Sequence, residues 1–191
     1  AQVLAVLNAS PFHAGKGPER EQRMRERVAD CGLPLVYAHL VGGQDEVIFE
    51  GRSFALNAQG ETVARAEGFR EADLAVQASL GPQGVDLHAA PEALVPMASA
   101  DAELWDALVL GVRDYLGKNG FKGAILGLSG GIDSALVLAI AVDAIGADKI
   151  HAVMMPSPYT ADISWIDSRD MVKRLGVRYD EISIAPLFDG F

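Results

Sequence analysis

The segment best able to do chemistry is an octapeptide rich in glycine and serine. It reads Gly127-Leu128-Ser129-Gly130-Gly131-Ile132-Asp133-Ser134. Adjacent glycines let backbone N–H groups turn toward a ligand, and the serine hydroxyls can donate hydrogen bonds to phosphate oxygens. A carboxylate beside bound phosphate is repelled unless a divalent cation bridges the two groups, so Asp133 implies Mg²⁺. The segment therefore predicts a phosphate-binding loop with Asp133 as a metal ligand.

Other interpretations explain less of this segment. It lacks the lysine and the spacing of a Walker A loop. Its Gly-x-Ser-x-Gly pattern also fits a nucleophile elbow, in which Ser129 would attack a carbonyl carbon. That class needs an acid and then a histidine from later loops, whereas the one downstream histidine, His151, precedes any plausible acid partner. A purely structural turn would account for the glycines but not for the serines and the aspartate.

The elements that would position this loop alternate between helix and strand. Their expected order is helix 102–118, strand 124–128, helix 134–145, strand 150–155, helix 163–175 and strand 177–184. Strand–helix alternation with short connections predicts a doubly wound parallel sheet. Ligands bind at the carboxyl ends of the strands in such sheets, so 129–134 and 156–162 are the expected ligand-binding loops.

Residues 1–66 mix strand and helix signals. Strands are expected over 2–7, 35–41, 47–50, 52–56 and 61–66, with a helix over 19–30 and a tight turn at 57–60. Acidic and basic residues interleave along that helix, which predicts a solvated face. The pattern indicates part of a layered α/β protein with an antiparallel section. Residues 71–98 lose periodicity and collect glycine and proline, so we expect a linker between two domains there.

Composition narrows the function classes. The 191 residues include 16 basic and 26 acidic side chains, and the net charge of −10 disfavours a nucleic-acid-binding protein. One cysteine excludes an internal disulfide and fits a reducing compartment, so we expect a cytoplasmic protein. The longest apolar run, 135–145, is shorter than the about 20 residues that span a bilayer, so no membrane partner is expected. The chain lacks an initiator Met and a polar tail, which predicts a piece of a longer protein.

The segment 129–134 is similar to the Ser-Gly-Gly-x-Asp-Ser signature of the PP-loop ATP pyrophosphatases, which cleave ATP between its α and β phosphates. The wider context, over 115–136 and 151–160, resembles NAD⁺ synthetase. Two segments of the first half, 7–12 and 41–46, resemble the nitrilase-like glutaminase domain of glutamine-dependent NAD⁺ synthetases. Together these resemblances cover nearly the whole chain, in the order in which that family has the two domains.

The resemblance implies two incomplete domains. Residues 1–70 would be the C-terminal part of a nitrilase-like α/β sandwich, 71–98 a linker, and 99–191 the N-terminal part of a PP-loop domain. The implied activity is ATP-dependent amidation of deamido-NAD⁺ to NAD⁺ through an adenylate, with ammonia from glutamine, as the final step of NAD biosynthesis. The isolated chain is expected to be inactive. A GMP synthetase-like or tRNA-thiolating PP-loop enzyme, or a non-catalytic ATP-binding fragment, remains the alternative.

The resemblance also implies roles for particular residues. The octapeptide 127–134 would bind the ATP phosphates, with Asp133 on Mg²⁺, and 155–160 would approach the adenine and ribose. Ser10 and Lys16 match positions that hold the glutamine substrate. The family's Glu–Lys–Cys triad would lie upstream of residue 1, so no catalytic residue is expected in this chain. His39 stands where related proteins often have Asn, and a homo-oligomer is implied.

Overall fold

The computed structural model describes residues 1–82 and 84–190. Gln83, in the expected linker, and Phe191, at the end of the expected second domain, lie outside the described residues. The chain packs into two compact units, Ala1–Gly111 and Val112–Phe191. Both units contain helices and strands, which confirms the expected mixed α/β class. Among the described residues, no helix is long and apolar enough to cross a membrane.

The first unit is built around a four-stranded sheet in the order β1-β2-β5-β6. Its strands are β1 (Leu4–Asn8), β2 (Leu35–His39), β5 (Phe54–Leu56) and β6 (Thr62–Arg65). β1 and β2 run parallel, whereas β5 and β6 continue the sheet in antiparallel fashion. A separate antiparallel hairpin is formed by β3 (Val41–Gln44) and β4 (Val47–Glu50). These pairings confirm the expected antiparallel section.

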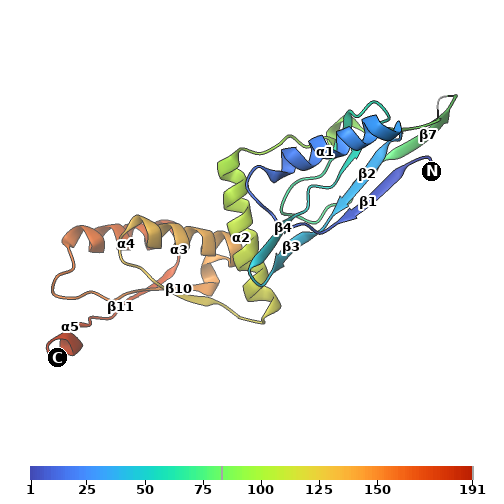
Figure 1. Ribbon diagram of the computed structural model, residues 1–191. Coiled ribbons are helices and arrows are strands. Elements are labelled where there is room, and N and C mark those ends of the chain that lie inside the picture. The colour runs from blue at the N-terminus through green and yellow to red at the C-terminus, as the bar shows by residue number, and fades with distance from the viewer. Residues whose placement is uncertain (83, 191) are drawn as a thin grey trace. The chain divides into compact units, whose positions relative to one another are not determined.

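Helix α1 (Lys16–Cys31) covers one face of this sheet (Figure 1), where its apolar side chains pack against β2 and β5. The solvated face expected for this helix is only partly present, because Arg20 and Glu21 are buried. Arg20 is paired with Glu50 and Glu21 with Arg65, at separations of 30 and 44 residues along the chain. Ion pairs between residues far apart in the sequence therefore link α1 to β4 and β6.

The opposite face of the sheet is covered by part of the expected linker. Within it, β7 (Gln77–Gly81) and β8 (Gly84–His88) form an antiparallel hairpin. Leu87 of β8 is 3% exposed and packs with Ala55 and Ala64 of the sheet. This stretch is therefore packed into the first unit rather than open, and the boundary between the two units falls inside the helix that follows it. The domain limits expected from composition stay a prediction.

The tight turn expected at 57–60 is confirmed, and the side chain of Asn57 organises it. Its Oδ1 accepts hydrogen bonds from the backbone N–H groups of Gln59 (3.1 Å) and Glu61 (2.8 Å), and the side chain is buried. We expect Asn57→Ala to lower the free energy of unfolding by about 1–3 kcal/mol, because it leaves these donors without an acceptor. Urea denaturation would measure the loss. The exposed neighbour provides the control, since Gln59→Ala should change stability by less than about 0.5 kcal/mol.

The second unit contains a three-stranded parallel sheet in the order β11-β10-β9. Its elements are β9 (Ala124–Gly127), α3 (Ile132–Ile145), β10 (Ile150–Met154), α4 (Asp162–Leu175) and β11 (Arg178–Glu181). The predicted strand–helix alternation around a parallel sheet is confirmed. Helix α2 (Ala100–Lys118) was also expected, whereas the short helices were not; these are η1 (Pro91–Ala93), η2 (Ala147–Lys149) and α5 (Ala185–Phe188).

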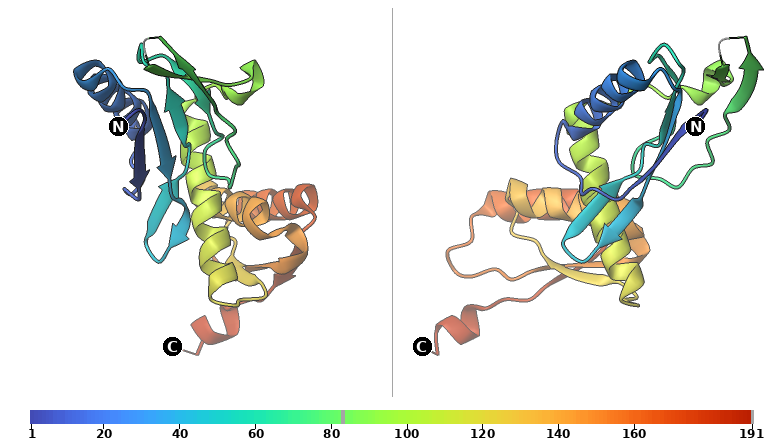
Figure 2. Two further views of the ribbon diagram at one scale, coloured as in Figure 1. Left: turned by 90° about the vertical axis from the view of Figure 1, so that its right-hand side faces the viewer. Right: turned by 45° about the vertical axis from the view of Figure 1, so that its right-hand side comes forward.

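Helices α3 and α4 lie on the same side of the parallel strands (Figures 1 and 2). Leu138 of α3 and Val172 of α4 pack with Ile150 and Ala152 of β10 in one buried cluster. On β9, Ile125 is 73% exposed. A doubly wound sheet carries helices on both faces, so that part of the expected fold class stays a prediction.

Candidate functional site

The predicted phosphate-binding loop follows β9, leads into α3, and has its two hydroxyl groups bonded to one another. Ser129 Oγ and Ser134 Oγ are 3.0 Å apart, and Ser134 Oγ donates to the carbonyl oxygen of Gly131 (2.9 Å). Since Ser134 uses its proton on that carbonyl, the proton between the hydroxyls comes from Ser129. The backbone N–H groups of Ser129 and Gly131 donate to Ser134 Oγ (3.2 Å) and Ser129 Oγ (3.3 Å) respectively. The hydroxyls therefore brace the loop, and a phosphate would compete with these internal bonds.

Gly130 occupies a backbone position in this loop that excludes other residues. Its φ of +79° lies in the left-handed region, which favours glycine. A Cβ atom there would lie 2.5 Å from both the Cα and the carbonyl oxygen of Ser164 in α4. Because those are backbone atoms, they cannot rotate aside. The loop therefore packs directly on the first turn of α4.

The structure brings the loop together with the second expected ligand-binding segment. Gly127 and Ser129, at the carboxyl end of β9, line a cavity of about 300 Å³ together with residues that follow β10. The other lining residues are Leu128, Met154, Met155, Pro156 and Thr160. Carboxyl ends of adjacent parallel strands are where open α/β sheets bind ligands. The cavity therefore joins the predicted phosphate-binding and adenosine-binding segments in one place.

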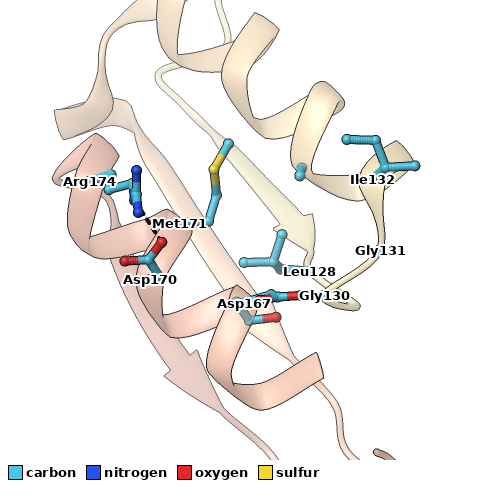
Figure 3. Close-up of a pocket in the computed structure, with 10 residues that line it drawn as sticks. Leu128, Gly130, Gly131, Ile132, Asp167, Asp170, Met171 and Arg174 are labelled. Carbon is cyan, nitrogen blue, oxygen red and sulfur yellow. Dashed lines mark hydrogen bonds and ion pairs between the residues drawn. The ribbon is translucent and has the colours of Figure 1, made fainter. Parts of the chain in front are cut away.

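A second cavity, of about 400 Å³, lies between the loop and α4 (Figure 3). Gly130 lines it from the loop, and Asp167, Asp170, Met171 and Arg174 line it from α4. Arg174 Nε lies 2.6 Å from Asp170 Oδ2, so its charge is already paired with a carboxylate. The remaining carboxylate repels an anion. We therefore assign the candidate phosphate site to the first cavity.

Asp133 is exposed in the first turn of α3, near the positive end of the helix dipole. Across residues 1–82 and 84–190, no three His, Cys, Asp or Glu side chains are placed to hold a metal ion together. Asp133 would therefore supply a single protein ligand, with phosphate oxygens and water as the others. Mg²⁺ is commonly held in that way, by one or two carboxylates and substrate phosphates. The donor fits the ion, and the metal-ligand role stays a prediction.

The two residues predicted to bind glutamine lie between β1 and α1. Ser10 follows β1, and Lys16 is the first residue of α1 and is exposed. Ser10 Oγ accepts a hydrogen bond from Arg20 Nη2 (2.9 Å) and lies 3.4 Å from His39 Nε2. Arg20 is ion-paired with Glu50, which is 1% exposed. Neither Arg20 nor Glu50 is among the site residues predicted from the sequence. The one sequence feature that could have indicated the pair is the position of Glu50 at the end of an otherwise apolar strand.

His39, the last residue of β2, is buried beside Ser10. Its ring stacks on that of Tyr37 at 5.9 Å between centroids, and its backbone N–H donates to Ser53 Oγ (3.0 Å). Burial lowers the pKa of the imidazole below its usual value, and the charge of Arg20 lowers it further. The ring is therefore neutral at pH 7. Within the described part of the chain, its Nδ1 is buried without a hydrogen-bond partner.

Glycine loops that connect a parallel strand to a helix are characteristic of nucleotide-binding α/β proteins, and the second unit has a loop of this kind between β9 and α3. Residues 104–191 match the model of the NAD synthase family.

Similarity to known proteins extends over both units. The chain is 46% identical to the glutamine-dependent NAD(+) synthetase of Rhodobacter capsulatus over 184 residues, which are 96% of this chain and 33% of the relative. It is also 46% identical to that of Synechocystis over 97% of this chain and 33% of the relative. A solved structure of the glutamine-dependent NAD+ synthetase from Acinetobacter baumannii, in complex with ADP, is 40% identical to this chain and superposes on it with a TM-score of 0.92. The match covers 100% of this chain and 35% of that chain. The chain thus spans about a third of the length of the relatives it matches.

Proposed function

We propose that this chain is part of a glutamine-dependent NAD⁺ synthetase, which amidates deamido-NAD⁺ to NAD⁺ with consumption of ATP. The observation that carries the proposal is the braced loop Ser129–Ser134 beside a cavity, in a chain that is 46% identical to one such enzyme over 184 residues. The ADP in the Acinetobacter baumannii relative supports an adenine nucleotide as ligand.

The domain division that we propose follows this assignment. Residues 1–70 would belong to a nitrilase-like glutaminase domain, and 99–191 to a doubly wound PP-loop domain. The mixed sheet of the first unit and the parallel sheet of the second are compatible with that division. Residues 71–98 would connect the domains while packing one hairpin on the first. A cytoplasmic homo-oligomer is part of the same proposal.

At the loop, the chain's own residues bind and orient ATP. Backbone N–H groups at the start of α3 would bind the phosphates, and Ser129 and Ser134 would exchange their mutual hydrogen bond for bonds to phosphate oxygens. The carboxylate of deamido-NAD⁺ then attacks the α-phosphorus, and pyrophosphate leaves. Ammonia attacks the resulting acyl adenylate, AMP leaves, and the amide loses a proton. When bound at Asp133, Mg²⁺ supplies charge stabilisation to the departing pyrophosphate.

In the first unit, the chain would contribute to glutamine binding without catalysing hydrolysis. Ser10 and Lys16 offer a hydroxyl and a cation, which suit the carboxylate of an amino acid. The one cysteine, Cys31, ends α1 and is exposed. We assign it no catalytic role, because the proposed Glu–Lys–Cys triad belongs to the part of the enzyme that precedes residue 1.

The proposal is tested with the intact protein, ATP, MgCl₂ and deamido-NAD⁺, with either glutamine or ammonium as nitrogen donor. We expect NAD⁺, AMP and pyrophosphate in equal amounts with both donors, measured by chromatography. Production of ADP and phosphate, or absence of NAD⁺ with both donors, would refute the assignment. AMP formed only with xanthosine monophosphate or a tRNA would favour another PP-loop enzyme.

A further inference from the structure

His39 contacts the predicted glutamine site but has no role in the function proposed above. It lines a cavity of about 450 Å³ at the carboxyl ends of the parallel strands β1 and β2. Asn8 and Ala9, which precede Ser10, line the same cavity. The imidazole thus reaches from the cavity wall to the hydroxyl of Ser10, 3.4 Å away.

The absence of a hydrogen-bond partner at Nδ1 indicates which nitrogen of the His39 ring carries the proton. A neutral imidazole has one N–H and one bare nitrogen. If Nδ1 carried the proton, a buried donor would have no acceptor, and buried N–H groups without a partner are rare in proteins. If Nε2 carries it, the bare Nδ1 is the only unsatisfied atom, and Nε2 has an acceptor in Ser10 Oγ. The geometry therefore favours the Nε2–H tautomer.

The hydroxyl of Ser10 is then surrounded by two donors. Arg20 Nη2 donates to Ser10 Oγ at 2.9 Å, and in the Nε2–H tautomer His39 Nε2 donates to the same oxygen at 3.4 Å. Arg20 must be the donor in its hydrogen bond with Ser10, because a guanidinium group has donors only. Two donors fill both lone pairs of the serine oxygen, so its own proton must be directed to a third group. Ser10 is thereby fixed as a hydrogen-bond donor.

We propose that His39 is a positioning residue, which with Arg20 orients the Ser10 hydroxyl as a donor to an oxygen of the bound substrate. The inference rests on the proposed role of Ser10 in glutamine binding, and it adds the direction of that hydrogen bond. A donor at Ser10 selects a carboxylate or carbonyl oxygen and disfavours an ammonium group. The ion pair of Arg20 with Glu50 holds the guanidinium in place for this task.

The charged and titratable groups around His39 are compatible with a neutral donor ring. Arg20 faces it from α1, Glu50 from β4 is paired with Arg20, and Tyr37 stacks on it from β2. Burial disfavours a second proton on His39, and that proton would also add a charge beside Arg20. These two effects lower the pKa of the ring and outweigh the opposing effect of nearby backbone groups.

A matched pair of variants in the intact enzyme tests the proposal. The side chains of Gln and Met are similar in length and volume, but only a Gln side chain at position 39 can donate a hydrogen bond to Ser10. His39→Met is expected to raise KM for glutamine about tenfold with little change in kcat, because one hydrogen bond to Ser10 is lost. The KM of His39→Gln should stay within about threefold of the parent value. NAD⁺ synthesis from ammonium should be unchanged in both variants, which excludes a general folding defect.

The contact with Ser10 is isolated by repeating both substitutions in a Ser10→Ala background. There, His39→Met and His39→Gln are expected to have the same KM for glutamine, because the atom that receives the hydrogen bond is absent. Equal KM values for the two variants with Ser10 present, or a persistent difference without it, would overturn the proposal. A Ser10→Ala protein with an unchanged KM would instead remove the glutamine-binding role on which the proposal rests.

The tautomer can be measured independently of activity. Long-range ¹H–¹⁵N spectra of the intact protein, labelled at histidine and assigned with the His39→Gln variant, distinguish a protonated Nε2 from a protonated Nδ1. We expect the proton of His39 on Nε2. A proton on Nδ1 would refute the positioning role, even if the enzyme makes NAD⁺ from both nitrogen donors.

Discussion

Asp133→Asn in the intact protein is expected to lower ATP–pyrophosphate exchange at least about 100-fold, since metal-ion stabilisation of a departing phosphate is worth several kcal/mol. Asparagine keeps the shape of the side chain but removes the charge that would hold Mg²⁺. Glutamine hydrolysis should persist, because it requires no residue of this loop. Exchange of labelled pyrophosphate into ATP measures the first activity, and release of glutamate measures the second.

The control for Asp133 must separate metal binding from helix stability. Asp133 also lies at the positive end of the α3 dipole, where loss of its charge costs about 0.3–1 kcal/mol. Asp101→Asn makes the same change in the first turn of α2, where the aspartate is likewise exposed. It should reproduce the small loss of stability and leave exchange unchanged. Exchange within about threefold of the parent in Asp133→Asn would mean that Asp133 is not the metal ligand.

Gly130→Ala is expected to lower the free energy of unfolding by about 2–5 kcal/mol, from left-handed backbone strain and from overpacking against α4. The added methyl group would lie 2.5 Å from the Cα and the carbonyl oxygen of Ser164. Relief of that overlap requires the loop or the first turn of α4 to move. The variant should therefore also lose affinity for ATP. Thermal unfolding and calorimetric titration with ATP measure the two effects.

A second glycine of the same unit separates the two causes of this loss. Gly120 has a φ of +74° but nothing within 4 Å of its would-be Cβ atom. Gly120→Ala should therefore cost only the backbone strain, about 1–2 kcal/mol, and leave ATP affinity unchanged. Equal losses of stability in the two variants would contradict the steric account of Gly130.

The elements of the fold were largely predictable because their signals are local. The helix over α3 follows from its long apolar run and from Gly146, which ends it, and the strand over β10 follows from its short apolar run. The strand expected over 35–41 instead ends at His39, because the residues that follow pair with β4 as a separate hairpin. The hairpin in the expected linker was not predicted because the alternation of apolar and polar residues in β7 is short and lies among glycines and prolines, and the strand is exposed along its length.

The site was predictable only where its parts are contiguous in sequence. The loop 129–134 carries its own glycines, serines and aspartate, so its residue types alone suggest phosphate binding. The pairing of Arg20 with Glu50 joins residues 30 positions apart, and such partners are set by tertiary packing. Ser164 likewise meets Gly130 through its backbone and its Cβ atom, which most residue types share, so the identity of the side chain does not predict the contact.

The bond between the Ser129 and Ser134 hydroxyls has a thermodynamic consequence for ligand binding. Ordering a flexible residue costs about 1–2 kcal/mol of conformational entropy, and in a braced loop this loss occurs during folding instead of at the encounter with ATP. The same bond must be broken when a phosphate arrives, so the enthalpy gained there is the difference between two similar hydrogen bonds. Association of ATP with this preorganised loop should therefore show a small entropic penalty and a modest favourable enthalpy.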